Sequence, residues 1–114
     1  MKSHDRRRGG MKFLIFNLID VPKVPDVSKA ADDVWASPPA DVKVLAGYTC
    51  LGLAYPGMPS NSIMSVRLVE AESNESLAAV IYPVAVAGAT VWSTPVMDLP
   101  LGGGVADMEK KLRS

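Results

Sequence analysis

Apolar residues follow a strand-like pattern early in the chain and a helical pattern directly afterwards. Met11–Ile19 is apolar at nearly every position and leads into a turn over residues 20–25 that holds two prolines. A helix follows, for which Asp26 or Ser28 is the expected N-cap and Pro38-Pro39 the expected end. Its apolar stripe has the spacing i, i+3, i+4, i+7 and i+8 and consists of Val27, Ala30, Ala31, Val34 and Trp35.

The middle of the chain predicts two further strands. Val42–Leu53 is the first of them, and Gly47 and Gly52 indicate a bulge or a close backbone approach within it. Residues 55–61 have the composition of a turn. Ser62–Glu72 then shows the clearest alternation in the sequence. One face of that strand carries Met64, Val66 and Leu68, and the other carries Ser65 and Arg67.

A second helix is predicted from about Glu75, because Ser73 and Asn74 supply caps and Glu75 an acid for the first turn. Residues 80–86 are rich in β-branched side chains and are also compatible with a strand. Pro83 must kink or end any helix that reaches it. We therefore assign a helix to the first half of this segment and leave residues 82–88 open between helix, loop and strand.

A fourth strand, Ala89–Met97, completes the order β-α-β-β-α-β, which is the split βαβ pattern of a ferredoxin-like sandwich. The fold class is therefore α+β, with a four-stranded antiparallel sheet and a short C-terminal helix or tail. We divide the chain into a disordered N-terminal extension over residues 1–10, a ferredoxin-like domain over 11–104 and a C-terminal short helix or tail over 105–114.

Both faces of the predicted sheet are apolar, and two helices can cover only one of them. Along the first strand, one face carries Leu14, Phe16 and Leu18 and the other carries Phe13, Ile15 and Ile19. A second copy of the chain is the simplest cover for the remaining face, so we expect a homodimer. We place the face of Ile15 against the partner; if the parity is reversed, Phe16 takes that place.

Composition and charge narrow the range of partners. Hydrophobic residues make up 48% of the chain, charged residues make up 21%, and the net charge is zero. Residues 11–114 hold eight basic and eleven acidic side chains, so the body of the chain lacks the basic patch that nucleic acid requires. No apolar run approaches the ~20 residues of a membrane span. The single cysteine, Cys50, fits a reducing compartment, and we expect a cytoplasmic protein.

The segment from Ser62 to Met97 resembles the second half of the small dimeric α/β-barrel proteins, the superfamily that includes the antibiotic-biosynthesis monooxygenases. The similarity rests on two short motifs: an acidic turn after the third strand, Glu70-Ala71-Glu72-Ser73, and the end of the last strand, Thr94-Pro95-Val96-Met97. It extends loosely over residues 11–98 and is strongest for a subgroup of uncharacterised small domains. The resemblance implies the fold and a dimeric α/β barrel, whereas activities within the superfamily differ.

Residues suited to catalysis are scarce. The only histidine, His4, lies in the N-terminal extension, which removes the commonest general base and metal ligand from the domain. Glu70 and Glu72 share a strand face, but two carboxylates alone make a weak cation site. We interpret Cys50 as a buried, inert thiol within a strand. We therefore expect no catalytic residue, no metal and no cofactor.

One set of residues could line a pocket inside the expected barrel: Asn17, Tyr48, Arg67 and Trp92. A guanidinium with amphipathic aromatic neighbours is suited to a small anionic or aromatic ligand. The alternative is that Arg67 pairs with an acid across the dimer interface while the aromatic residues fill the core. The sequence thus favours a small dimeric protein that binds a small ligand or a protein partner. The alternative function is a cofactor-independent monooxygenase or isomerase acting on a small aromatic or enolisable substrate.

Overall fold

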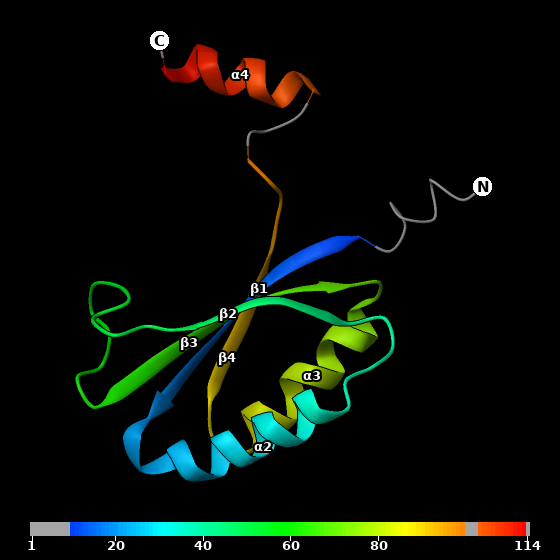
Figure 1. Cartoon of the computed structure of the whole chain (residues 1–114). Helices are drawn as coiled ribbons and strands as arrows, with labels where there is room; N and C mark the ends of the chain where they lie inside the picture. The colour runs from blue at the N-terminus through cyan, green and yellow to red at the C-terminus, as the bar shows by residue number, and fades with distance from the viewer. Residues whose placement is uncertain (1–9, 100–102, 114) are drawn as a thin grey trace.

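Two helices cover one face of a four-stranded antiparallel sheet and leave the other face open (Figure 1). The computed structural model describes residues 10–99 and 103–113. The strands are β1 (Met11–Asp20), β2 (Lys43–Thr49), β3 (Ser62–Ala71) and β4 (Thr90–Val96). The helices are η1 (Val21–Lys23, a 3-10 turn), α2 (Val24–Ala36), α3 (Asn74–Val86) and α4 (Gly103–Arg113). This arrangement confirms the prediction of an α+β fold with an antiparallel four-stranded sheet.

The sheet has the strand order β2-β3-β1-β4, with β1 and β3 in the centre. This order is compatible with a ferredoxin-like fold. The apolar residues of β1 facing α2 and α3 are buried, and Ile15 is only 3% exposed. Its neighbour Val69 on β3 is fully buried. The core therefore lies between the sheet and the helix layer, in two clusters centred on Val69 and on Val27.

The expected parity of the sheet is wrong. Phe13, Ile15 and Ile19 pack beneath α2 and α3, so Ile15 is part of the core of a single chain and not of the face left for a partner. The register places Ile15 opposite Arg67 on β3, so Arg67 also faces the helices. The face opposite the helices, called the open face, carries the other residues of both strands, namely Leu14, Phe16, Leu18, Met64, Val66 and Leu68. Of these, Met64 is nonetheless buried.

Helix α2 begins earlier than the cap residues predicted. It starts at Val24 with Pro25 in its first turn, where the missing N–H of proline costs no hydrogen bond. Neither expected cap residue caps the helix: Asp26 lies within the first turn, where its charge suits the helix dipole. The helix ends at Ala36, before the two prolines, as predicted.

Strand β2 is shorter than expected and irregular. Its pairing with β3 shifts between Val44 and Ala46, so the bulge falls at Leu45 and not at a glycine. Cys50 lies one residue beyond the strand and is partly accessible, which corrects its interpretation as a buried mid-strand thiol. Its backbone N–H donates to the carbonyl of Met64 at 2.9 Å.

Helix α3 starts at the predicted cap and continues past Pro83. The Ser73 hydroxyl accepts a hydrogen bond from the backbone N–H of Ser76 at 3.1 Å. The Ser76 hydroxyl in turn donates to Asp41 at 2.6 Å and ties the start of α3 to the segment before β2. The helix runs to Val86 with Pro83 inside it, so the segment left open is helical up to that residue. Leu77, Val80 and Val84 hold it against the core.

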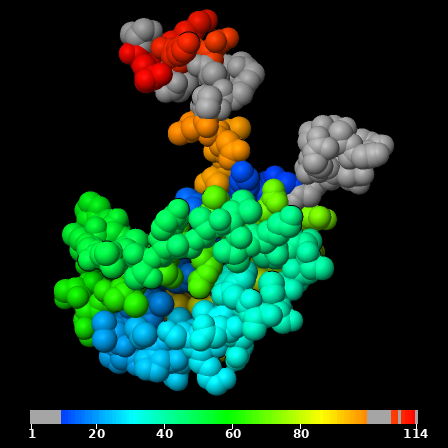
Figure 2. Space-filling model, viewed as in Figure 1, coloured from blue at the N-terminus to red at the C-terminus, as the bar shows by residue number. Residues whose placement is uncertain are grey.

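The C-terminal helix stands apart from the sheet and the other helices (Figures 1 and 2). Its expected apolar side chains include Met108 and Leu112, and both are exposed. The predicted disordered extension, residues 1–10, lies outside the described residues except for Gly10. Within the described part of the chain, no helix has the length and apolar character needed to cross a membrane.

Candidate functional site

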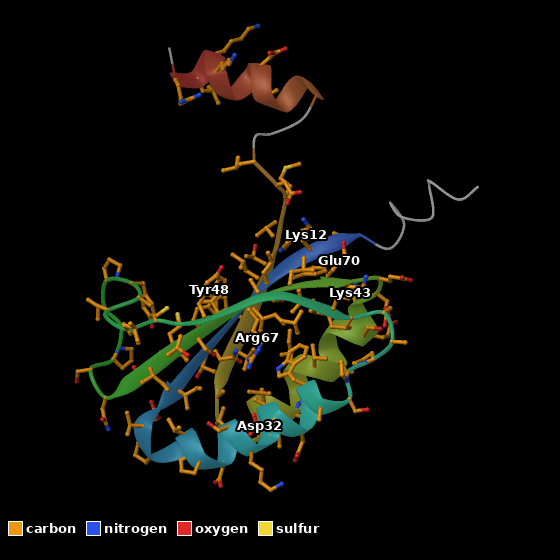
Figure 3. All side chains as sticks on the ribbon, viewed as in Figure 1. Lys12, Asp32, Lys43, Tyr48, Arg67 and Glu70 are labelled. Carbon is orange, nitrogen blue, oxygen red and sulfur yellow. The ribbon has the colours of Figure 1, made fainter. Side chains whose placement is uncertain are left out.

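The residue that organises the candidate site is Arg67, in the middle of β3. Its side chain projects from the sheet toward α2 (Figure 3). The guanidinium carbon Cζ lies 5.3 Å from the centre of the Trp35 ring, so the cation stacks on an aromatic residue of α2. Burial lowers the pKa of Arg67, and the nearby carboxylate of Asp32 opposes that shift. The guanidinium remains charged at neutral pH, because the ordinary pKa of an arginine lies far above neutrality.

A small cavity of about 180 Å³ lies between α2 and the sheet, beside this guanidinium. Its polar lining comes from Asn17 and Ser65 on the sheet, Ser28 and Asp32 on α2, and Thr49 at the end of β2, together with Arg67. The rest of its wall is apolar. The cavity therefore combines one positive group, one negative group and several neutral hydrogen-bonding groups in a space of a few heavy atoms.

Asn17 is the polar residue buried most deeply in the described part of the chain, at 4% exposure. It lies directly opposite Ser65, and its amide Nδ2 donates to the Ser65 hydroxyl at 3.3 Å. The amide is thus held in one orientation at the cavity wall. A buried asparagine on the core face of a central strand costs stability unless its polar atoms are partnered.

A second, more open pocket of about 290 Å³ adjoins β2. Thr49, Ser65 and Arg67 line both this pocket and the first cavity, whereas Tyr48 lines only the second. Gly47 lies opposite Arg67 in the register, and a Cβ placed on it would lie 3.7 Å from the Arg67 Cγ. The absence of a side chain there leaves the stem of Arg67 accessible from the β2 side.

The four predicted pocket residues do not form one site. Arg67 lines the first cavity, called the inner cavity below, together with Asn17. It lines the second, outer pocket together with Tyr48. Trp92 lies on the open face, where its ring stacks on Phe16 with centroids 5.3 Å apart and an angle of 12° between the planes. The sequence reasoning missed Asp32 and Trp35. The available signal was their position along α2, since Trp35 belongs to the apolar stripe that faces the sheet and Asp32 directly follows Ala31 of that stripe.

The open face carries the largest uncovered apolar surface of the sheet. One row crosses all four strands, because the register aligns Tyr48, Val66, Phe16 and Trp92. Tyr48 is 69% exposed and Trp92 40%. At one end the face closes with a charged row of Lys43, Glu70 and Lys12 (Figure 3). There Lys12 donates to Asp98 at 2.8 Å, and this contact raises the lysine's pKa.

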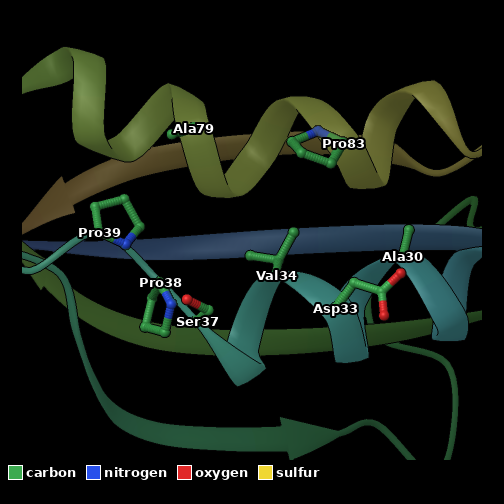
Figure 4. Close-up of a pocket in the computed structure, with 8 residues that line it drawn as sticks. All are labelled: Ala30, Asp33, Val34, Ser37, Pro38, Pro39, Ala79 and Pro83. Atoms are coloured by element: carbon green, nitrogen blue, oxygen red, sulfur yellow. The ribbon is translucent and has the colours of Figure 1, made fainter.

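A third hollow lies on the far side of the helix layer, between α2 and α3 (Figure 4). It has a volume of about 550 Å³ and is lined mainly by alanine and proline side chains. Asp33 lies at its edge, but this carboxylate already pairs with Lys29 one turn earlier, at 3.2 Å. The groove presents few polar groups that converge on a common point. Among the described residues, no group of three or more His, Cys, Asp or Glu side chains could hold a metal ion.

No protein-family model matches this chain, and no curated protein sequence matches it significantly. Among solved structures, it is similar to the solution structure of the C-terminal domain of the MgtC protein from Mycobacterium tuberculosis. The TM-score is 0.57 at 9% identity, over 77% of this chain and 89% of that domain. A Bacillus cereus protein related to NIF3 also matches, with a TM-score of 0.38 at 13% identity over 78% of this chain. The match covers 26% of that protein. At these identities the first likeness shows the fold alone, a small α+β domain.

Proposed function

We propose that this protein is a homodimeric binding protein that holds a small anionic ligand against Arg67. The observation that carries the proposal is that the guanidinium of Arg67 is half-buried and that its N–H donors have no partner within the described chain. Within residues 10–99 and 103–113, the Arg67 guanidinium takes part in no hydrogen bond and no ion pair, and it stacks on the face of Trp35. Every fully buried side-chain nitrogen or oxygen in that part of the chain has a partner. The free donors of Arg67 therefore remain accessible to a ligand.

A carboxylate is the group that matches these donors best. The guanidinium presents its N–H groups as a planar fork that pairs with two oxygens at once. Stacking on Trp35 fixes the plane of that fork, so less conformational entropy is lost when a ligand binds. Asn17 and Ser65 add an amide and a hydroxyl to the same wall. A cavity of about 180 Å³ has room for roughly six heavy atoms, at about 30 Å³ each.

Titration with propionate, followed by amide chemical shifts in two-dimensional NMR, tests this proposal. We expect the shifts to concentrate on Asn17, Thr49 and Ser65. Replacing Arg67 by Met should abolish binding, and Arg67→Lys should weaken it roughly tenfold or more, because the charge remains but the fork is lost. Lys43→Met removes a cation from the far end of the open face and should leave the affinity unchanged. Equal affinity in wild type and Arg67→Met would refute the proposal.

The dimer part of the proposal rests on the open face. A sheet of four strands about 4.8 Å apart presents roughly 500 Å² on such a face, so two faces bury about 1,000 Å² together. That area is at the lower end for a specific interface, but its centre is apolar and aromatic, and its charges lie at the rim, as in stable interfaces. The resemblance of Ser62–Met97 to dimeric α/β-barrel proteins supports the same pairing.

A charge placed at the centre of this face should separate the copies. Phe16→Lys should raise the dimer dissociation constant about a hundredfold or more, because the ammonium loses its water without gaining a partner. Tyr48→Lys, at the side of the same row, should raise the dissociation constant less. This variant tests the interface independently if Phe16→Lys does not fold. Val86→Lys is the matched control, since Val86 is an exposed valine at the end of α3 in the helix layer. Light scattering that gives all variants the mass of the wild type would contradict this interface.

A further inference from the structure

The inner cavity has charges of opposite sign on its two walls. Arg67 forms part of the sheet wall, and Asp32 forms part of the helix wall, on α2 (Figure 3). The two groups are near enough for the carboxylate to act on the guanidinium electrostatically. They nevertheless form no ion pair or hydrogen bond with each other in the described part of the chain. Both side chains line the cavity, and Asp32 is also exposed to solvent, so a ligand that enters the cavity lies near both charges.

We infer that the ligand of this cavity is a small zwitterion, of the size and charge pattern of a short aliphatic amino acid. The inference rests on the proposed binding of an anionic group to Arg67. The ligand's carboxylate pairs with the guanidinium, and its ammonium lies toward the carboxylate of Asp32. The hydroxyl of Ser28, one turn before Asp32 on the same helix, lines the same wall and offers the ammonium a further acceptor.

The charge of Asp32 sets this preference. A simple carboxylate bound to Arg67 would add a second negative charge near Asp32 and would be repelled by it. A zwitterion brings its own positive charge to that side, so the repulsion becomes an attraction. A plain amine gains from Asp32 but is repelled by Arg67. Ligands with both groups should therefore bind more tightly than those with either one alone.

The neutral part of the cavity limits the size of the ligand. Its apolar wall is made of aliphatic side chains from the sheet, α2 and α3, among them Ile19, Val27 and Val84. These surfaces suit a methyl or another short aliphatic group and offer no partner to a polar side chain. About 180 Å³ accommodates a molecule of roughly six heavy atoms, which is the size of alanine.

Three probes built on the same short aliphatic chain test the inference: alanine, propionate and ethylamine. Propionate is alanine without its ammonium, and ethylamine is alanine without its carboxylate. We expect NMR titration of the full chain at pH 7 to show alanine binding about tenfold or more tightly than propionate, with ethylamine the weakest. Asp32→Asn should remove the advantage of alanine, and propionate should then bind at least as well as it does to the wild type.

The neighbouring acid provides the control. Asp33→Asn makes the same chemical change one residue along α2, but Asp33 pairs with Lys29 and does not line the inner cavity. This variant should keep the preference for alanine. Propionate binding as tightly as alanine in the wild type would overturn the zwitterion while leaving the anion site in place. Loss of the preference in both variants would also overturn it, since the effect would then be one of net charge. Binding of none of the three probes would overturn both the zwitterion and the anion site.

Discussion

At the scale of single residues, the site depends on polar groups placed where the core would otherwise be continuous. Asn17 and Arg67 take positions on the helix-facing side of two central strands whose neighbours are fully buried aliphatics such as Val69. Each carries a cost of burial, which Ser65 offsets for the amide and Trp35 for the guanidinium. Placing a cation and an amide together beside a cavity is costly in a purely structural core and useful in a binding site.

Asn17→Asp tests whether the guanidinium is available to an anion. The residue opposite Asn17 is Ser65, and Arg67 lies diagonally beyond it, at a spacing of about 7–8 Å that a long side chain spans. The new carboxylate should form an ion pair with the Arg67 guanidinium inside the chain and thereby abolish propionate binding. Asn17→Ser, which is neutral and smaller, should retain binding with a modest loss. Undiminished propionate affinity in Asn17→Asp, measured by the same titration, would show that the guanidinium does not hold the ligand.

At the scale of elements, most of the secondary structure follows from the sequence. The turn residues, the Ser73 cap and the alternation of β3 predict the elements in their correct order, with ends that differ by up to five residues. The start of α2 differs because Pro25 permits an earlier helix. Strand β2 ends at Thr49, the last residue that pairs with β3, and not at Leu53.

The parity of the sheet could not be predicted from the sequence, for a physical reason. Both sides of β1 are equally hydrophobic, so the alternation states which residues share a face but not which face the helices cover. The side that carries the polar residue Asn17 is the buried one, which the residue type of Asn17 does not predict. Arg67 was found from its residue type and its strand. Its partners Asp32 and Trp35 were not, because their contact with it depends on how α2 crosses the sheet.

The network at the start of α3 yields a prediction with a defined pH dependence. The Ser76 hydroxyl donates to Asp41 and lowers the pKa of that carboxyl below its ordinary 3.8. A depressed pKa in the folded state stabilises the fold above about pH 4, and this contribution is lost as the pH falls through the lowered value.

Ser76→Ala should therefore lower the thermal midpoint by a few degrees at pH 7. The gap to the wild type should narrow as the pH falls below 3.8 toward 2. Thermal unfolding followed by circular dichroism across that range measures it. Ser60→Ala, in the exposed loop before β3, serves as the control and should follow the wild type. A gap that stays constant from pH 7 to pH 2 would mean that Asp41 does not contribute through this hydrogen bond.

At the scale of the whole molecule, the two faces of the sheet differ, because the chain itself covers only one of them. The helix layer covers one face, and the cavity beside Arg67 lies between that layer and the sheet. The other face keeps its aromatic row of Tyr48, Phe16 and Trp92 uncovered within the chain, while α4 stands away from it (Figure 2). An apolar surface of this extent is at the upper end of what monomers expose. A second copy is the partner that such a face fits, because a two-fold axis pairs each aromatic row with its equivalent.

Sedimentation equilibrium of the full chain at micromolar concentration tests this account most directly. The chain mass is 12.1 kDa, and the account predicts a species of about 24 kDa for the wild type. For Phe16→Lys it predicts a shift toward 12.1 kDa. A wild-type mass of 12.1 kDa with no concentration dependence would contradict it, and α4 would then be the segment left to cover the open face.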